Sequence, residues 1–211
     1  MKNILILMLL LLTIISCHKQ DKNVLATAHI TDSIALKLNR DAIRHMHKIS
    51  AVNNDSINNL IYDSSLTLLN HAIEIDSLFL TAYINKAQVL QRKKLYNEAL
   101  EVLSKVQKIR PEMAEIIMGQ GFILEKIGKP QLAEEKYKQS LRSYEKRLES
   151  DGTNEVNTKS DIAFLYIFLE DKNKAINEIQ NLILENPSNE VLKGKEEIIR
   201  NFDRAKFIKE Y

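Results

Sequence analysis

The residues whose side chains could do chemistry are few and scattered: one cysteine, Cys17, and five histidines. The histidines are His18, His29, His45, His47 and His71. A metal site needs ligands that converge, but His45 and His47 are two residues apart and would point to different faces of a helix. The sequence contains no paired-histidine motif, nucleophile elbow or glycine-rich phosphate loop. We therefore expect no catalytic residues, no metal and no cofactor, and we expect that the chain is not an enzyme.

Cys17 stands at the end of an apolar leader. The chain begins with Met1 and Lys2, residues 4–12 are all apolar, and polar residues follow directly after Cys17. A basic start followed by an apolar run of about a dozen residues is typical of a secretory signal peptide. The run is too short for a permanent membrane span, which needs about 20 apolar residues. The leader therefore predicts export.

The leader ends in Ile14-Ile15-Ser16-Cys17, which resembles the lipobox of bacterial lipoproteins. That resemblance implies a diacylglycerol on Cys17, cleavage after Ser16 and a further acyl chain on the new N-terminus. Two or more acyl chains anchor a protein stably to a membrane. The alternatives are an uncleaved anchor or a plain secretory signal with a chance cysteine. The expected division is a signal peptide at 1–16, a polar tether at 17–30 and a folded domain at 31–211.

The composition favours helices and gives no case for nucleic acid. The 211 residues include 30 basic and 28 acidic ones, so the net charge of +2 lacks the strongly basic balance of a nucleic-acid-binding domain. With only 5 glycines and 3 prolines, turn formers are few. Abundant Ala, Leu, Ile, Glu and Lys favour helices over a sheet. An all-α fold is the expectation.

A helical pattern recurs with a period of 34 residues. The first copy begins at Leu80, and its spaced bulky, small and proline positions are Tyr83, Ala87, Leu90, Ala99, Leu103, Val106 and Pro111. This pattern resembles the tetratricopeptide repeat, a 34-residue helical hairpin. The second copy begins at Ala114 and has Gly121 at the small position and Gly128 in the turn between its helices. Glycine accommodates a positive φ in such a turn.

A third copy begins near Val156 and ends at Pro187. Eight extra residues fall before it, so the second helix of the middle copy is expected to run on to about Ser150. Upstream, helices over about 31–49 and around 66–76 read as a degenerate copy. The clear resemblance covers 80–188.

The resemblance implies an α-solenoid of three to four hairpins with a C-terminal capping helix. Each hairpin buries its apolar stripe only by stacking on the next. Ala87, Gly121 and Ala163 are expected where helices approach closely. The stretch 191–209 is expected to form one capping helix, with Ile198, Phe202, Ala205 and Ile208 on its apolar face.

In this family the first helix of each hairpin lines a concave groove. The residues that the resemblance places there include a candidate partner-binding set of Gln88, Arg92, Met118, Phe122 and Lys126. Polar side chains, a flexible methionine and a phenylalanine can together grip an extended peptide or a helix. The third copy also contributes Phe164 and Phe168, but the run 162–169 is apolar throughout, and we expect the last helix to cover them.

The sequence predicts a membrane-tethered scaffold or adaptor of the bacterial cell envelope. Its expected partners are another envelope protein or peptide and, through the lipid on Cys17, the membrane. The scarcity of acidic residues just after Cys17 favours the periplasmic side of the outer membrane. The alternatives are a periplasmic receptor for a peptide or small ligand, or an accessory subunit of a secretion or envelope-assembly complex.

Overall fold

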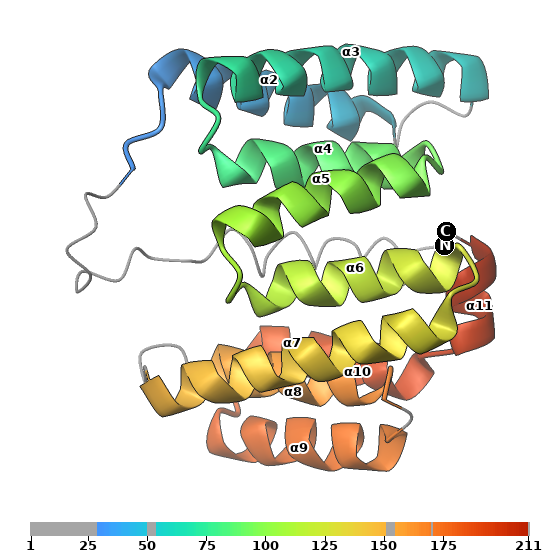
Figure 1. Cartoon of the computed structure of the whole chain (residues 1–211). Coiled ribbons are helices and arrows are strands. Elements are labelled where there is room, and N and C mark those ends of the chain that lie inside the picture. The colour runs from blue at the N-terminus through green and yellow to red at the C-terminus, as the bar shows by residue number, and fades with distance from the viewer. Residues whose placement is uncertain (1–28, 50–53, 151–154, 170, 211) are drawn as a thin grey trace. The chain divides into compact units, whose positions relative to one another are not determined.

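The computed structural model describes residues 29–49, 54–150, 155–169 and 171–210. Within these ranges every regular element is an α-helix, which confirms the all-α prediction. The helices are α2 (Ser33–Lys48), α3 (Asp55–Ile75), α4 (Leu80–Arg92), α5 (Tyr96–Ile109), α6 (Ala114–Lys126), α7 (Pro130–Ser150), α8 (Glu155–Tyr166), α9 (Lys172–Glu185), α10 (Glu190–Asn201) and α11 (Arg204–Glu210). They fall into two compact units that divide between Pro111 and Glu112. Figure 1 shows the helices in order along the chain.

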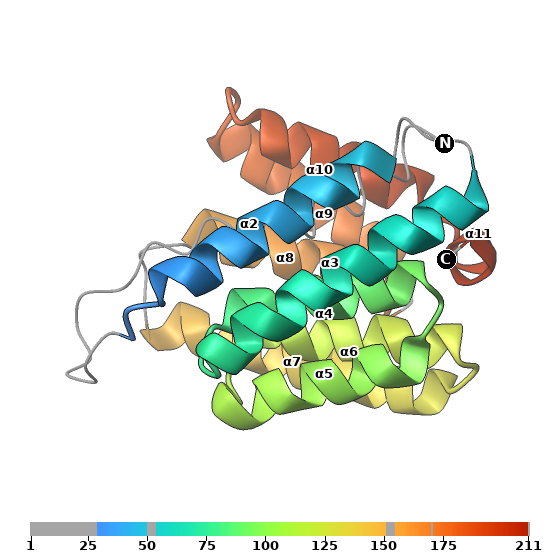
Figure 2. The ribbon, with the colours of Figure 1, turned by 90° about the horizontal axis from the view of Figure 1, so that it is seen from above.

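The unit that ends at Pro111, unit 2, contains two helical hairpins. The helices α2 and α3 run side by side as the first hairpin (Figure 2), and α4 and α5 form the second. Leu69, Ala72 and Phe79 are buried between the two hairpins, together with Ala82 and Val89 of α4. The degenerate upstream copy is therefore a hairpin, and it packs on its neighbour as repeats in a stack do.

The turn between two paired helices has the same backbone geometry in both strong copies. Gly128 has φ 74° and Lys94, one 34-residue period earlier, has φ 60°. In each turn the next residue's N–H donates to a carbonyl five residues back: Leu95 to Leu90 at 2.9 Å and Lys129 to Leu124 at 2.8 Å. This is a helix ending closed by one residue in the left-handed region. The predicted role of Gly128 is confirmed.

Unit 1, the other compact unit, contains the helices α6 to α11, which follow Glu112. Its helices pair in chain order, α6 with α7 and α8 with α9, and α10 packs on α9 and α8. The helix α7 runs to Ser150, as the eight extra residues predicted. Residues 151–154, which follow this helix, lie outside the described residues. The buried small residues Gly121 and Ala163 lie inside this unit, and Ala87 is buried in unit 2.

The C-terminal stretch differs from the single capping helix that the sequence predicts. The chain leaves helical geometry at Phe202, and Asp203 starts a new helix by accepting a hydrogen bond from the Lys206 N–H at 3.0 Å. The break turns the following residues, so that Phe207 is buried and Ile208 is 42% exposed. On α10 the buried residues are Leu192, Lys195 and Ile199 rather than Ile198. The predicted apolar face was therefore wrong for Ala205 and Ile208, which are exposed, whereas the ring of Phe202 does pack inward on Phe168.

The predicted signal peptide at 1–16 and nearly all of the predicted tether at 17–30, including Cys17, lie outside the described residues. Among the residues that are described, no helix combines the length and the apolar character needed to cross a bilayer.

Candidate binding site

The five residues of the predicted groove divide between the two units. Gln88 and Arg92 lie on α4 in unit 2, where both are partly exposed. Met118, Phe122 and Lys126 lie on successive turns of α6 in unit 1. The residues of α6 therefore form a set by themselves.

The α6 residues do not line an open groove, which corrects the expectation for Met118 and Phe122. Met118 is fully buried and Phe122 is only 6% exposed. Phe122 is covered by the C-terminus, because α11 packs against α6 and places Phe207 on the ring of Phe122 with centroids 5.6 Å apart. A surface that an external partner would have to reach is thus covered by a short helix of the same chain. Figure 1 shows α11 beside the C-terminal end of α6.

A continuous aromatic cluster lies under this contact. Its members are Phe122, Tyr137, Phe164, Phe168, Phe202 and Phe207. Phe168, in the turn after α8, is central: its ring centroid lies 4.6 Å from that of Phe122, 4.8 Å from Phe202 and 5.4 Å from Phe207. Tilted and edge-on rings at such distances attract beyond simple burial. The expectation that the C-terminal residues cover Phe168 is confirmed.

Charged groups from the last turn of α6 complete the contact with α11. The guanidinium of Arg204 approaches the two carboxylate oxygens of Glu125 at 2.6 and 3.4 Å, and the Glu125 side chain is 1% exposed. The ammonium of Lys126 lies 4.4 Å from the centroid of the Phe207 ring and donates to the Phe207 backbone carbonyl. We call Phe122, Glu125, Lys126 and Phe168 the α11 seat. It offers rings for an aromatic side chain and a carboxylate for a cation.

A second polar cluster in unit 1 ties helices together. The Lys195 ammonium on α10 lies 2.6 Å from an Asp161 carboxylate oxygen and 2.7 Å from the Ser160 hydroxyl on α8. Arg147 of α7 binds both carboxylate oxygens of Glu115 on α6, at 2.6 and 3.1 Å. Glu115 and Ser160 thus both bind residues of the same unit.

Burial sets the electrostatics of this second cluster. It raises the pKa of the Asp161 carboxyl, although Lys195 acts in the opposite direction. Burial also raises the pKa of the Tyr144 hydroxyl, and the nearby Glu115 carboxylate adds to that effect. Burial would lower the pKa of Arg147, but its hydrogen bonds to Glu115 raise it overall. Each cation thus has a carboxylate partner, as buried charges require.

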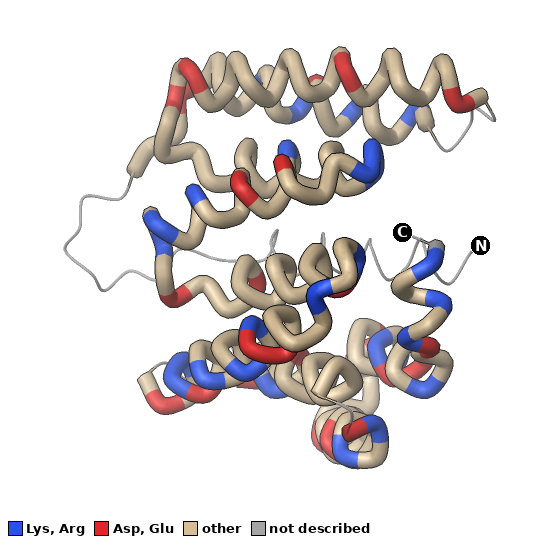
Figure 3. Tube along the Cα trace, turned by 45° about the vertical axis from the view of Figure 1, so that its right-hand side comes forward, with Lys and Arg blue, Asp and Glu red and all other residues tan. Residues whose placement is uncertain are grey.

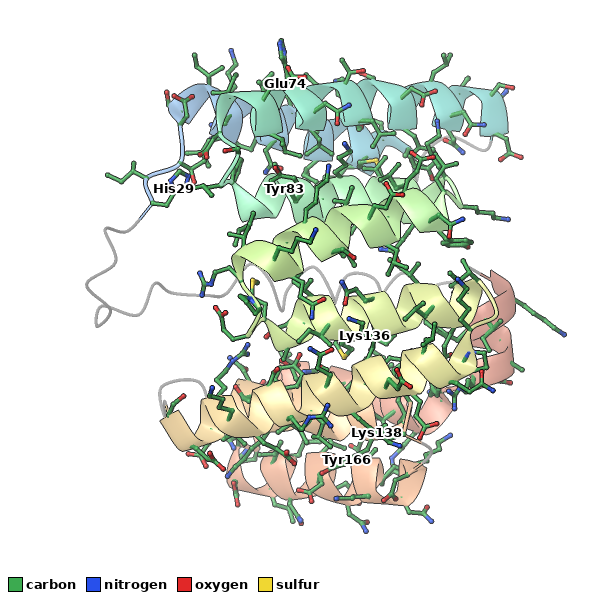
Figure 4. All side chains as sticks on the ribbon, viewed as in Figure 1. His29, Glu74, Tyr83, Lys136, Lys138 and Tyr166 are labelled. Carbon is green, nitrogen blue, oxygen red and sulfur yellow. The ribbon has the colours of Figure 1, made fainter. Side chains whose placement is uncertain are left out.

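Outside these clusters the polar groups act locally. The imidazole of His29 (Figure 4) binds the Asp76 carboxylate at 2.8 Å in unit 2, and His45 binds the Ser64 hydroxyl at 3.0 Å. In the described ranges no three His, Cys, Asp or Glu side chains lie together as a metal site would require. Along α7 acidic and basic residues are interspersed (Figure 3), so this helix presents no stripe of one sign.

The sequence did not reveal the α11 seat as a closed contact. Its contacting pairs lie far apart in the chain. The sequence separation is 79 residues for Glu125 and Arg204 and 81 residues for Lys126 and Phe207. The sequence gives one signal for this contact. Phe122, Phe164 and Phe168 lie at groove positions of the repeats, and two more phenylalanines, Phe202 and Phe207, lie near the C-terminus.

Comparison with known proteins identifies the repeat. Residues 80–113, which hold α4 and α5, match the tetratricopeptide repeat family. No curated protein matches the chain. Among solved structures, a double mutant of MamA RS-1 is 16% identical, with 84% of this chain and 90% of that one covered and a TM-score of 0.46. A tetratricopeptide repeat protein of Thermus thermophilus is 14% identical, with coverage of 80% and 100% and a TM-score of 0.38.

A tetratricopeptide repeat protein of Parabacteroides merdae is also similar in structure. It is 12% identical, with 80% of this chain and 73% of that one covered and a TM-score of 0.42. In the present chain, the matched hairpin at 80–113 is followed by hairpins of the same kind, and its turn geometry recurs one period later at Gly128. The match to the tetratricopeptide repeat family therefore covers residues 80–113, and α6 to α9 continue the pattern of paired helices.

Proposed function

We propose that this protein is a non-enzymatic scaffold that binds a segment of a partner protein at the α11 seat and is tethered to a membrane of the bacterial envelope by a lipid on Cys17. The repeat fold supports a role in protein or peptide binding. The envelope location is supported by the leader and by Ile14-Ile15-Ser16-Cys17. A lipid tether at one end leaves the repeat units free to bind a second protein.

One observation carries the binding part of this proposal: the seat holds a short helix by one aromatic side chain and one charge pair. Phe207 lies on the rings of Phe122 and Phe168, and Arg204 binds the buried carboxylate of Glu125. A few aromatic and arginine anchors in desolvated positions dominate most protein interfaces. The seat therefore has the chemistry with which proteins recognise helical segments.

A receptor for a small ligand is the alternative, and one feature bears on it. A pocket of about 530 Å³ lies on α9 and α10, lined by Asn177, Gln180, Asn181, Ile183, Leu184 and Glu196. Its amide side chains could hydrogen-bond a polar ligand. Unlike the seat, it has no buried charge and no aromatic ring among its lining residues, so the seat is favoured.

The test is photocrosslinking in cells that make the full chain at its native level. A benzophenone amino acid replaces Lys129, which is exposed just beyond the last turn of α6, and in a matched variant it replaces Asn177 at the α9–α10 pocket. We expect a reproducible protein adduct from position 129 in the membrane fraction. An adduct from position 177 alone would move the interface to the pocket. The absence of any protein adduct from position 129 would contradict the proposed function.

A further inference from the structure

The helix α11 contacts its unit through Arg204, which binds Glu125, and through Phe207, whose ring packs on Phe122 and whose carbonyl accepts a hydrogen bond from Lys126. It has 7 residues, far fewer than a helix needs for stability by itself. Ala205, Lys206, Ile208 and Lys209 are all exposed, and Phe207 is the one side chain of 204–209 that is buried. Arg204 and Phe207 are three residues apart and therefore lie on one face of the helix. Arg204 and Phe207 thus anchor α11 to its unit.

The seat beneath α11 is built without any residue of α11. Phe122, Glu125 and Lys126 belong to α6, and Phe168 belongs to the turn after α8. Both parts are positioned by the hairpin packing of α6 on α7 and of α8 on α9. We therefore expect the seat to keep its form when its occupant leaves.

The joint before α11 is short and anchored on its near side. Phe202 is extended, with φ −65° and ψ 125°, and Asp203 is the one other residue between α10 and α11. The ring of Phe202 packs on Phe168, and its carbonyl accepts a hydrogen bond from Lys172 at 3.3 Å. Rotation at Asp203 can therefore release α11 while Phe202 still covers part of the aromatic cluster. Such element-terminal residues are the usual hinges of proteins.

We propose that α11 is an exchangeable resident of the seat, and that the partner's docking segment is a short helix with a basic residue three positions before an aromatic residue. This inference rests on the proposed function and names the class of segment that it binds. The aromatic ring takes the place of Phe207 on Phe122 and Phe168, and the basic residue takes the place of Arg204 at Glu125. In the resting protein α11 occupies the seat and holds the partner off.

The short joint between α10 and α11 sets the strength of the competition between α11 and the partner's segment for the seat. A segment joined by a short linker reaches its site at an effective concentration of about millimolar. The partner therefore binds with an affinity reduced by the fraction of seats that α11 leaves open. A change that empties the seat should raise the affinity by that same factor. The α11 of a second copy of this chain is a less favoured occupant of the seat, because the joint of two residues keeps each α11 beside its own seat.

The experiment measures binding of a fluorescein-labelled nonapeptide with the sequence of residues 203–211 to the full chain in detergent, by fluorescence anisotropy. The wild type is compared with Phe207→Ala, which removes the anchor, and with Ile208→Ala, a matched change on the exposed side of the same helix. We expect Phe207→Ala to bind the peptide at least about 10-fold more tightly than the wild type. Ile208→Ala should bind like the wild type, and peptides with Arg204→Glu or Phe207→Ala should not bind.

Three results would overturn the inference. The first is equal peptide affinity of wild type and Phe207→Ala when both melt cooperatively. The second is loss of cooperative unfolding in Phe207→Ala, which would make α11 part of the core. The third is a concentration-dependent dimer of the wild type in which α11 is exchanged between copies. Hydrogen exchange on the wild type adds an independent readout, since amides of 205–210 should exchange much faster than those of α6.

The two proposals fail separately. A protein adduct from position 129 without peptide exchange would leave the scaffold function standing and refute the exchange of α11. Peptide exchange without any protein adduct would support the seat as an exchangeable site and refute its use in the cell.

Discussion

Gly121 of α6 lies directly against the ring of Tyr137 on α7. A Cβ atom at position 121 would stand 2.3 Å from Cε1 of Tyr137, and the ring is fully buried. It cannot give way easily, because it also packs on the ring of Phe168 with centroids 5.1 Å apart. The small residue that the repeat pattern requires at this position is thus explained by one aromatic neighbour.

Replacing this glycine should therefore loosen unit 1. We expect Gly121→Ala to lower the free energy of unfolding by about 1–3 kcal/mol, the usual range for overpacking, less any gain in helix propensity. Denaturant titration followed by circular dichroism measures it. Gly194→Ala on α10 is the control: its added Cβ meets no atom within 4 Å, so it should stabilise by about 0.5–1 kcal/mol. Equal effects of the two changes would contradict this account.

Lys94 occupies the turn position that Gly128 occupies one repeat later. Its φ of 60° costs a residue with a Cβ roughly 1–2 kcal/mol, whereas glycine adopts it freely. After the greater entropy of glycine in the unfolded chain is subtracted, Lys94→Gly should stabilise by about 0.5–1 kcal/mol. Gly128→Ala, where nothing lies within 4 Å, should destabilise through the backbone alone. Thermal melting of both variants checks the pair, and a lower melting temperature for Lys94→Gly would refute the reasoning.

The Lys195–Asp161 pair is the most buried ion pair among the described residues, with both side chains 5% exposed. Lys195→Met should leave the Asp161 carboxylate without a partner and cost about 3–5 kcal/mol at neutral pH. The cost should shrink at acidic pH, because burial already raises the pKa of Asp161 and a proton can neutralise it. Adding Asp161→Leu should restore most of the loss. A pH-independent cost for Lys195→Met would show that its origin is packing rather than charge.

Asp76 links the start of α2 to the turn before α4. Burial acts to raise the pKa of its carboxyl, but hydrogen bonds from His29 and from the backbone N–H groups of Asp32 and Leu78 lower it overall from the ordinary 3.8. Below that value the unfolded chain binds more protons than the folded one, so the stabilisation is present above pH 3.8 and is lost as pH falls through the folded pKa.

Removing the histidine should weaken this acid dependence. We expect His29→Ala to bring the pKa of Asp76 closer to its ordinary value, as measured by NMR titration of the carboxyl carbon. The unfolding free energy of His29→Ala should also fall less steeply with acid than that of the wild type. An unchanged carboxyl titration would mean that the backbone donors alone hold the pKa of Asp76 down.

The lipid tether makes its own prediction. Cys17→Ala should abolish incorporation of radiolabelled palmitate, block cleavage after Ser16 and release the chain from washed membranes, because one apolar leader without acyl chains anchors weakly. Ser33→Ala, a change in the folded domain, is the control and should be labelled and processed like the wild type. Membrane association and processing that are unaffected by Cys17→Ala would refute lipidation.

The repeating part of this protein could be predicted from its sequence alone. The 34-residue spacing predicted the hairpins from α4 onward, the small residue at Gly121, the left-handed turn at Gly128 and the extension of α7 to Ser150. These features depend on residues within one hairpin or its immediate neighbour, because a repeat contacts only the repeats next to it. Local spacing therefore carries the information.

The structure, by contrast, was needed to show how the C-terminus packs on the repeats of unit 1. The apolar spacing of 191–209 allowed one continuous helix, but the break at Phe202 and Asp203 places Phe207 on Phe122 and Phe168. The pairs Arg204–Glu125 and Lys195–Asp161 join residues that the sequence presents as ordinary helix-surface charges. Such contacts span long stretches of chain and depend on where each helix ends and turns. The spacing of apolar residues does not show in which direction the chain turns after a helix ends. The occupant of the α11 seat could therefore be seen only in the folded chain.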